Sequence, residues 1–209
     1  MSAPRVILAD TGMGNLRSVA RALERVGAEV TVTPDPDAVR AAPRLVVPGQ
    51  GGFGECAHAL EAGLGDAVRE HIASGRPYLG ICLGMQILFE GSEEAPGARG
   101  LGVFAGTVDR LASAPDPDDP TRRLKIPHMG WNEVEGHHPL LPAREWFYFV
   151  HSFCCVPTDH AVVVGEAEYG QAVCAAVARD NVFACQFHPE KSQHAGAALL
   201  GRFLEDAWS

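Results

Sequence analysis

Hydrophobic and polar positions follow two different periods along the first ninety residues. Short apolar, β-branched runs predict strands, and the longer amphipathic stretches between them predict helices. The predicted strands are residues 6–9, 29–32, 45–47 and 78–81. The predicted helices are residues 16–26, 37–42 and 57–74, followed by a shorter helix-compatible run at 85–90. This alternation predicts parallel strands that are joined by right-handed crossover helices.

The pattern changes after residue 100. Strand-like runs now follow one another, at residues 146–150, 161–165, 172–178 and 182–187, before a closing helix at about 195–207. The acidic, proline-rich segment 114–120 predicts an exposed loop between strands. We therefore expect one α/β domain with a mixed sheet over residues 1–209. A chain of this length can bury a core without disulfides or a structural metal.

Charge and cysteine content narrow the function classes. The chain carries 17 Lys and Arg against 26 Asp and Glu, a net charge of −9, and its densest basic cluster is only Arg122, Arg123 and Lys125. This balance argues against a nucleic-acid-binding protein. No apolar run approaches the roughly 18 residues of a membrane helix. The six cysteines form no CxxC pair and follow no secretion signal, so we expect reduced thiols and a cytoplasmic protein.

Three turns follow predicted strands at the edge where ligands bind in open α/β sheets, which is outside the carboxyl ends of the strands. These turns are residues 10–15, 48–53 and 80–84, and each is rich in glycine. Candidate chemistry is therefore expected at these positions first.

Cys82 is the candidate nucleophile. It lies in the sequence Gly-Ile-Cys-Leu-Gly, residues 80–84, directly after an apolar strand and before a helix-compatible run. Glycines two residues before and two after permit a tight strand-to-helix turn of the nucleophile-elbow type. The backbone N–H groups at such a helix start favour the thiolate. The alternative is a buried structural cysteine, which acts as a small hydrophobe.

A thiol nucleophile needs a base, and the base needs a group that orients it. Phe-His-Pro-Glu at 187–190 can supply both. His188 and Glu190 are two residues apart, so in an extended segment they project to the same side. The alternatives are a surface histidine at a strand end and a solvated carboxylate. The pair gains weight only if Cys82 lies on a neighbouring strand.

Acyl chemistry also requires donors for a developing oxyanion. The N–H of Leu83, the residue after the nucleophile, is one candidate. The turn Pro-Gly-Gln-Gly-Gly at 48–52 is the other, because glycines allow a loop to aim its N–H groups at a small ligand. The alternatives for this turn are a plain connector or an anion-binding loop, and glycine-rich signals do not separate them.

The sequences Gly-Ile-Cys-Leu-Gly-Met-Gln at 80–86 and Phe-His-Pro-Glu-Lys at 187–191 together resemble the triad-type, class I glutamine amidotransferases. The resemblance implies a flavodoxin-like fold with a mixed, mostly parallel sheet flanked by helices. Three further segments resemble one branch of the family, the glutaminase subunits of imidazole glycerol phosphate synthases. They are Pro-His-Met-Gly-Trp-Asn at 127–132, Phe-Val-His-Ser at 149–152 and Gly-Ser-Glu-Glu-Ala-Pro-Gly at 91–97.

The resemblance implies a role for each matching position. It makes Cys82 the nucleophile, His188 the general acid and base, and Glu190 the residue that orients His188. It implies that the oxyanion hole is formed by Gln50, Gly51 and Leu83, and that the substrate glutamine is held by Gln86, Glu94, His151, Ser152 and Phe153. Two positions depart from the family: Gln50 stands where many members have a small or apolar residue, and Phe153 where a tyrosine is expected.

The resemblance also implies a partner and no cofactor. Ammonia from glutamine would pass into a (β/α)8 barrel cyclase subunit, so a docking face should border the Cys82 cavity. The candidates for this face are Asn15, Trp131, Tyr148 and Lys191. No cofactor and no metal are expected, and His137 and His138 have no further ligands at zinc-site spacing.

Two rival functions stay open at this point. One is a cysteine enzyme of the same scaffold, such as a glutaminase that serves another synthase. The other is a non-catalytic, flavodoxin-like binding module whose glycine-rich turns hold a phosphate or a flavin. The position of His188 relative to Cys82 in the fold separates the enzymes from the binding module.

Overall fold

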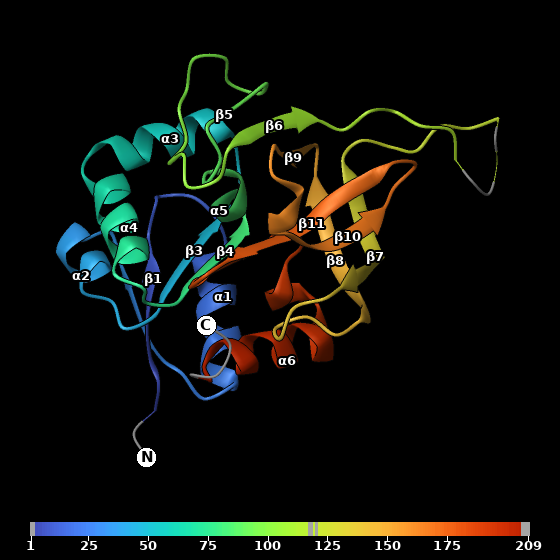
Figure 1. Cartoon of the computed structure of the whole chain (residues 1–209). Coiled ribbons are helices and arrows are strands. Elements are labelled where there is room, and N and C mark those ends of the chain that lie inside the picture. Colours follow the sequence, from blue (N-terminus) through green and yellow to red (C-terminus); the bar gives the residue numbers. More distant parts are fainter. Residues whose placement is uncertain (1–2, 117–118, 120, 206–209) are drawn as a thin grey trace.

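A mixed sheet runs through the molecule in the order β2-β1-β3-β4-β12-β11-β10-β7-β8 (Figure 1). The structure is a computed structural model that describes residues 3–116, 119 and 121–205. Five neighbouring strands in this sheet are parallel: β1 (Arg5–Ala9), β2 (Glu29–Thr33), β3 (Leu45–Gly49), β4 (Tyr78–Cys82) and β12 (Val182–Cys185). The four strands predicted in the first ninety residues are therefore present and parallel, as the sequence pattern predicts.

The remaining strands of this sheet are antiparallel to their neighbours. They are β7 (His128–Gly136), β8 (Arg144–His151), β10 (Val163–Glu168) and β11 (Ala172–Arg179). A second, small sheet in the order β5-β6-β9 lies beside the first. Its strands are β5 (Gly91–Ser92), β6 (Gly106–Arg110) and β9 (Phe153–Pro157). The sequence pattern did not predict β5, β6 or β7, because their polar and half-buried residues give no clear apolar run.

Helices cover both faces of the large sheet (Figure 1). One face is covered by α1 (Leu16–Arg25) and α6 (Gln193–Phe203), whose apolar residues share one buried cluster with β1, β4 and β12. The other face is covered by α2 (Pro36–Arg40), α3 (Phe53–Glu61) and α4 (Leu64–Ala73). Asn15 caps α1, and Asp35 followed by Pro36 begins α2, as helix starts prefer.

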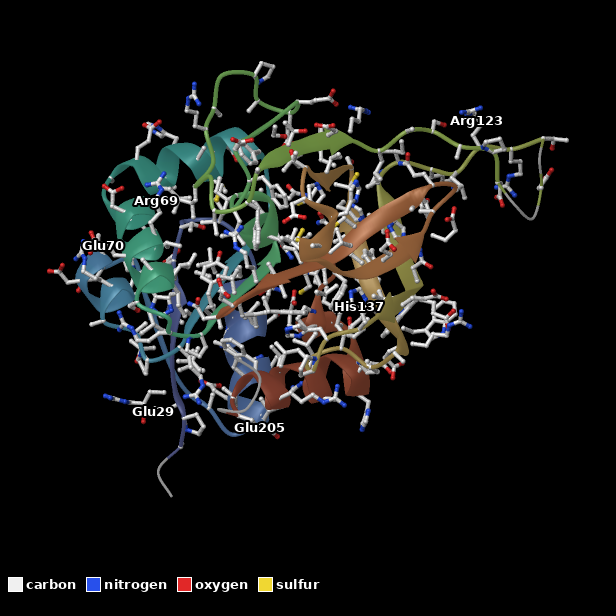
Figure 2. All side chains as sticks on the ribbon, viewed as in Figure 1. Glu29, Arg69, Glu70, Arg123, His137 and Glu205 are labelled. Atoms are coloured by element: carbon white, nitrogen blue, oxygen red, sulfur yellow. The ribbon has the colours of Figure 1, made fainter. Side chains whose placement is uncertain are left out.

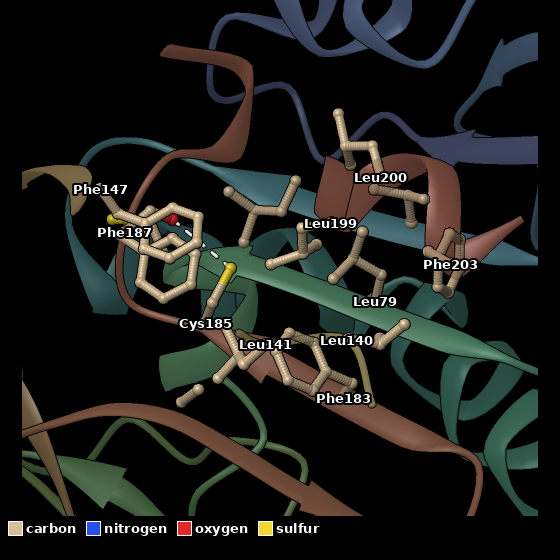
Figure 3. Close-up of a cluster of buried hydrophobic side chains, with 14 of the residues drawn as sticks. Leu79, Leu140, Leu141, Phe147, Phe183, Cys185, Phe187, Leu199, Leu200 and Phe203 are labelled. Atoms are coloured by element: carbon tan, nitrogen blue, oxygen red, sulfur yellow. Dashed lines mark hydrogen bonds between the residues drawn. The ribbon is translucent and has the colours of Figure 1, made fainter. Parts of the chain in front are cut away.

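The core is filled by large apolar side chains from strands that are far apart in the sequence. Figure 3 shows one cluster, in which Phe147 of β8 stacks on Phe187 with 4.0 Å between ring centroids. The thiol of Cys185 donates to the carbonyl oxygen of Phe187 at 3.5 Å. Because Phe187 is fully buried, its packing in the core fixes the backbone position of the next residue, His188.

Two predicted elements are interrupted in the structure. The helix predicted at 57–74 is two helices, α3 and α4, because Gly63 adopts φ +94°, which a right-handed helix cannot accommodate. The strand predicted at 161–165 begins late, since Ala161 and Val162 belong to a 3₁₀ turn, η1 (His160–Val162), that Asp159 caps. The sequence pattern was wrong at both boundaries for reasons of local turn chemistry.

Three other predicted elements end at different residues in the structure. The run predicted to be helical at 85–90 contains only the end of a short helix, α5 (Leu83–Gln86). The strand predicted at 182–187 ends at Cys185, and a 3₁₀ turn, η2 (Pro189–Lys191), follows His188. The closing helix ends at Phe203, and the predicted end at 207 lies outside the described residues.

The segment between β6 and β7 extends away from the body of the molecule (Figure 1). Among the described residues of the predicted loop 114–120, the one β-type contact is an isolated bridge between Pro115 and Arg123. Figure 2 labels Arg123 on this segment. On α4, Arg69 and Glu70 are exposed (Figure 2). Within residues 3–116, 119 and 121–205, none of the helices has the length and apolar composition that crossing a bilayer requires.

Candidate active site

Cys82 sits at a strained turn between β4 and α5. Its backbone has φ 54° and ψ −106°, and a positive φ is uncommon for a residue with a side chain. Such strain persists only where the surroundings enforce it, and it is often found at functional sites. The turn predicted from the spacing of glycines around Cys82 is therefore present, and it sets this cysteine apart from the cysteines within β9, β11 and β12.

The two glycines of the turn are required by close packing. A Cβ atom on Gly80 would lie 2.5 Å from the carbonyl oxygen of Gly84, and a Cβ on Gly84 would lie 1.8 Å from the carbonyl oxygen of Val47. Backbone atoms on both sides leave no room for a side chain. The glycines thus allow β4, α5 and β3 to approach each other closely enough to form the turn.

The glycine-rich turn after β3 lies beside the nucleophile. Gly49 is the register partner of Cys82 in the parallel pair β3 and β4. Gln50 and Gly51 follow directly, and Gly51 adopts φ +120°, a conformation that favours glycine. Gln50, Gly51 and Leu83 all line the same cavity as Cys82. The three predicted oxyanion-hole positions are therefore brought together around the sulfur.

His188 and Glu190 form a buried pair. The distance from His188 Nδ1 to Glu190 Oε1 is 2.8 Å, and both side chains are at most 2% exposed. Because Nδ1 is engaged by the carboxylate, the Nε2 side of the ring is left for Cys82. Nε2 is buried and has no hydrogen bond of ordinary geometry to any described residue. It is available to exchange a proton with the thiol or with a molecule in the cavity.

The electrostatic surroundings favour a protonated imidazole. Burial alone would lower the pKa of His188, but its interactions with the neighbouring Cys82 and Glu190 side chains outweigh burial and raise the pKa to about 9. A raised pKa means that the positive form is stabilised by its two neighbours. At neutral pH His188 therefore carries a proton on its ring, with the Glu190 carboxylate at Nδ1 and the Cys82 side of the cavity at Nε2.

Sheet register explains how residues more than a hundred positions apart meet. Cys185 of β12 pairs with Ile81 of β4 in parallel, so the chain after each strand emerges at the same edge. The predicted reason for the His188 and Glu190 contact was wrong in one respect. Glu190 lies in the 3₁₀ turn η2, not in an extended segment, and only His188 is extended, with φ −107° and ψ 94°.

A cavity of about 400 Å³ opens at Cys82. It holds most of the residues that the resemblance assigned to catalysis and substrate binding, together with Pro127 and Val150. The predicted residues that line it are Gln50, Gly51, Cys82, Leu83, Gln86, Glu94, His151, Ser152, Phe153, His188 and Lys191. Glu190 lies behind His188 and borders a separate, narrow space with Asn15.

Glu94 and Gln86 approach the cavity from different elements. The Glu94 carboxylate accepts a hydrogen bond of 2.7 Å from the backbone N–H of Phe53, at the start of α3. Gln86, on α5, is buried and donates to the carbonyl oxygen of Phe153 at 3.1 Å. A carboxylate suits an α-ammonium group, and an amide suits a polar substrate group.

The side chain of His151 is engaged inside the protein. Its Nδ1 lies 2.9 Å from the carbonyl oxygen of Phe153, and its Nε2 lies 3.0 Å from Nδ1 of His128. Burial, the larger cause, lowers the pKa of His151 to about 4 and that of His128 to about 3. Both rings are therefore neutral at pH 7, and any contact of His151 with a ligand falls to its backbone.

Three of the four predicted docking residues contact one another. Trp131 and Tyr148 are register partners on β7 and β8 with an edge-to-face contact, 6.2 Å between centroids. The Lys191 ammonium lies 5.9 Å from the Tyr148 ring. Trp131 is 44% exposed, and Met129, which the sequence did not single out, is 61% exposed on the same strand. Trp131 is therefore a surface residue and not part of the core.

Sequence reasoning missed several buried polar residues at this site. Ser192 donates to the carbonyl oxygen of His188 at 2.6 Å and accepts from the backbone N–H of Tyr148 at 3.0 Å. Gln186 donates to the sulfur of Cys82 at 3.4 Å. Gln186 precedes His188 by two residues, and this spacing is the signal that could have placed it on the same side of the chain.

Comparison with protein families decides the class. The family model for class-I glutamine amidotransferases matches residues 7–207. The chain belongs to this family. The class I amidotransferase match covers every residue of the candidate site, from Asn15 to Lys191.

Curated relatives of this amidotransferase share about half of its residues. A protein of Nitrosomonas europaea named imidazole glycerol phosphate synthase subunit HisH is 50% identical, over 96% of this chain and 97% of that protein. A protein of the same name from Methylococcus capsulatus is 49% identical, over 98% of each chain. A third, from Syntrophotalea carbinolica, is 47% identical over 95% of this chain and 98% of its own.

Solved structures of more distant proteins show the same amidotransferase fold. A structure described as a glutamine amidotransferase superposes with a TM-score of 0.70 at 22% identity, over 91% of this chain and 93% of that chain. The structure described as PurLQS from Thermotoga maritima gives a TM-score of 0.72 at 20% identity, over 97% and 98%. The predicted α/β fold with a large mixed sheet flanked by helices is confirmed.

Proposed function

We propose that this chain is the glutaminase subunit of an imidazole glycerol phosphate synthase, which hydrolyses L-glutamine to glutamate and ammonia. The single observation that carries the proposal is that Cys82 and His188 line one cavity, with Glu190 hydrogen-bonded to His188 from behind, in a chain about 50% identical over nearly its full length to curated subunits of that name. The chain is an enzyme of the glutaminase class.

In the first half of the reaction Cys82 attacks the side-chain amide carbon of glutamine. The sulfur forms the new bond, and the amide oxygen becomes the oxyanion of a tetrahedral intermediate. Backbone groups at Gln50, Gly51 and Leu83 would stabilise this oxyanion, because donors placed where charge develops lower the barrier. A thiolate on Cys82 beside the protonated His188 would attack without further activation.

His188 moves the protons. It gives its Nε2 proton to the amide nitrogen, the carbon–nitrogen bond breaks, and ammonia leaves a γ-glutamyl thioester on Cys82. The neutral imidazole then takes a proton from water, which attacks the thioester carbon. Glutamate leaves, and the sulfur again shares its proton with His188. Glu190 would hold the ring in the orientation that both steps need, because it fixes Nδ1.

The charged groups of the substrate match the rest of the cavity. Glu94 would pair with the α-ammonium group, and the backbone of residues 151–153 would bind the α-carboxylate. Gln86 would contact the substrate amide or hold the backbone of Phe153 in place. The His151 contribution is assigned to its backbone, since its ring is bonded to Phe153 and His128.

Ammonia must reach a partner without escape to water. We assign the docking face for a (β/α)8 barrel cyclase subunit to Asn15, Trp131, Tyr148 and Lys191, where aromatic and cationic groups meet at the edge of the site. That partner would consume the ammonia to form imidazole glycerol phosphate and an aminoimidazole carboxamide ribotide. We further assign the chain to the cytoplasm, where its six free cysteines would stay reduced, with no nucleic acid or membrane as partner.

The test is ammonia release from glutamine by the purified chain, with and without the cyclase subunit and its ribotide ligand. The proposal predicts stimulation when both are present. A chain that releases ammonia at its full rate alone, with no response to either, would favour a glutaminase of another system.

A further inference from the structure

Gln186 is fully buried between the nucleophile and the substrate side of the cavity, with 0% exposure. Its backbone N–H donates to the carbonyl oxygen of Ala175 at 2.8 Å, which anchors it to β11. Cys185 pairs with Ile81 in the parallel register of β12 and β4. Gln186 directly follows Cys185, and Cys82 directly follows Ile81, so Gln186 lies beside Cys82.

The orientation of the Gln186 amide is fixed by a backbone group. The carbonyl oxygen of Phe153 can only accept, so the atom of Gln86 that faces it at 3.1 Å is the nitrogen. The same nitrogen of Gln86 faces Gln186 at 2.9 Å, and that partner atom must be the Gln186 oxygen. The Gln186 nitrogen consequently faces the sulfur of Cys82 at 3.4 Å, as a donor.

The next link in the chain of hydrogen bonds has a single direction as well. Phe153 also accepts from His151 Nδ1 at 2.9 Å, so Nε2 of this neutral ring is an acceptor. Nδ1 of His128, 3.0 Å away, must then be the donor. A rigid acceptor at Phe153, held from two sides, leaves Gln86 and Gln186 one arrangement of their amides.

We propose that Gln186 is a positioning residue that directs one N–H bond at the Cys82 sulfur and ties that sulfur to Gln86 at the substrate pocket. The inference rests on the glutaminase function proposed above. A donor aimed at sulfur favours the thiolate over the thiol, because a hydrogen bond to a charged group is worth more than one to a neutral group. It also holds the sulfur in one position, from which attack on the bound amide is direct.

The experiment measures the alkylation rate of Cys82 by iodoacetamide as a function of pH, read by mass spectrometry of the peptide that contains Cys82. The first variant is Gln186→Met, which keeps the volume of the side chain and removes the donor. The second is Gln186→Ala, which also removes the donor and cannot clash with its neighbours, so a folded variant is obtained even if methionine does not fit. The matched control is Asn181→Leu. Asn181 lies just before β12, and its buried amide donates to Ile72 and Arg76, far from the sulfur.

The wild-type and Asn181→Leu proteins should share one pH midpoint of alkylation, whereas both Gln186 variants should shift it upward by about one pH unit or more. With glutamine as substrate, the Gln186 variants should lose at least about tenfold in kcat, with a smaller change in KM. Asn181→Leu should lower Tm and leave both kinetic constants within about twofold.

A pH midpoint in folded Gln186→Met or Gln186→Ala equal to that of the wild type would overturn the inference. So would an equal shift in Asn181→Leu, since the effect would then be general loosening of the fold. The alkylation measurement needs neither glutamine nor a partner. A wild-type chain without glutaminase activity even when the cyclase subunit and its ribotide ligand are present would contradict the proposed function, and the alkylation profiles would still decide the role of Gln186.

Discussion

The hydroxyl of Tyr78 donates a hydrogen bond of 2.9 Å to the carbonyl oxygen of Gly84, and so joins the start of β4 to the helix that follows Cys82. Both residues are buried. The bond links the two sides of the strained turn, and Cys82 lies between the two bonded residues in the sequence. It is a contact that no motif in the sequence indicates.

Tyr78→Phe should lower the free energy of unfolding by about 1–3 kcal/mol, because the buried carbonyl of Gly84 loses its donor. The measurement is urea unfolding at pH 7.5. Tyr169→Phe is the matched control, since the Tyr169 hydroxyl bonds to the carbonyl oxygen of Lys125 at 2.7 Å in an exposed setting and its loss should cost less. Equal losses in the two variants would contradict a special role for the Tyr78 contact.

Gly84→Ala should destabilise the protein by about 3 kcal/mol or more, or prevent folding, since the new Cβ would lie 1.8 Å from the carbonyl oxygen of Val47. Gly201→Ala, in the last turn of α6 with open space around it, should instead raise stability by about 0.5–1 kcal/mol. Thermal unfolding of the two variants checks both signs. A well-folded Gly84→Ala protein with unchanged Tm would show that β3 does not pack against this turn as described.

Acid should destabilise the fold through His128 and His151. Their pKa values are lowered to about 3 and about 4 in the folded chain, below the usual value near 6.5, because burial disfavours the charged form. A neutral buried histidine contributes stability that is present above pH 6.5 and is lost as pH falls toward the folded pKa. Each ring should account for about 2 kcal/mol of the loss between pH 7.5 and pH 5.

The measurement is the free energy of unfolding at these two pH values in wild type, His128→Asn and His160→Asn. His128→Asn should reduce the pH dependence by about 2 kcal/mol. His160 is exposed, so its substitution should leave the dependence unchanged. A pH dependence in His128→Asn identical to wild type would contradict a neutral, buried His128.

The opposite sign is expected at His188. Its pKa is raised to about 9 by Cys82 and Glu190 against the effect of burial, so its ion pair contributes stability below pH 6.5 that is lost as pH rises through about 9. Glu190→Gln removes the carboxylate charge that lies 2.8 Å from His188 Nδ1. It should lower the pKa of His188 and reduce kcat by at least about 100-fold.

NMR titration of His188 in Glu190→Gln checks the direction of the pKa change, and initial rates of ammonia release check the loss of activity. The control is Glu166→Gln, an exposed carboxylate on β10, which should change neither. Full activity in Glu190→Gln would show that this carboxylate does not orient the imidazole.

Much of the site could be predicted because its signals are local. The glycines at 80 and 84, the strand before Cys82 and the short spacing from His188 to Glu190 are each visible in a few consecutive residues. The meeting of Cys82 with His188 required only that β4 and β12 be parallel neighbours. The turn η2 was not visible, because an i, i+2 pair fits an extended segment and a 3₁₀ turn equally well.

The polar network could not be predicted because it depends on strand register. Gln186 reads as one more position in an apolar run, and its bonds to Cys82 and Gln86 come from elements about a hundred residues away. His128 and His151 are register partners on β7 and β8, yet β7 has no clear apolar alternation. Register is set by packing across the whole sheet and not by any single segment.

The central claim is that the Cys82 sulfur is the nucleophile that attacks glutamine. It is tested most directly by treating the protein with a diazo-ketone analogue of glutamine and locating the adduct by mass spectrometry, with Cys82→Ala as the control. We expect one adduct per chain on Cys82, prevented by excess glutamine, and no ammonia release by Cys82→Ala. An adduct on another cysteine, or ammonia release by Cys82→Ala at the wild-type rate, would contradict it.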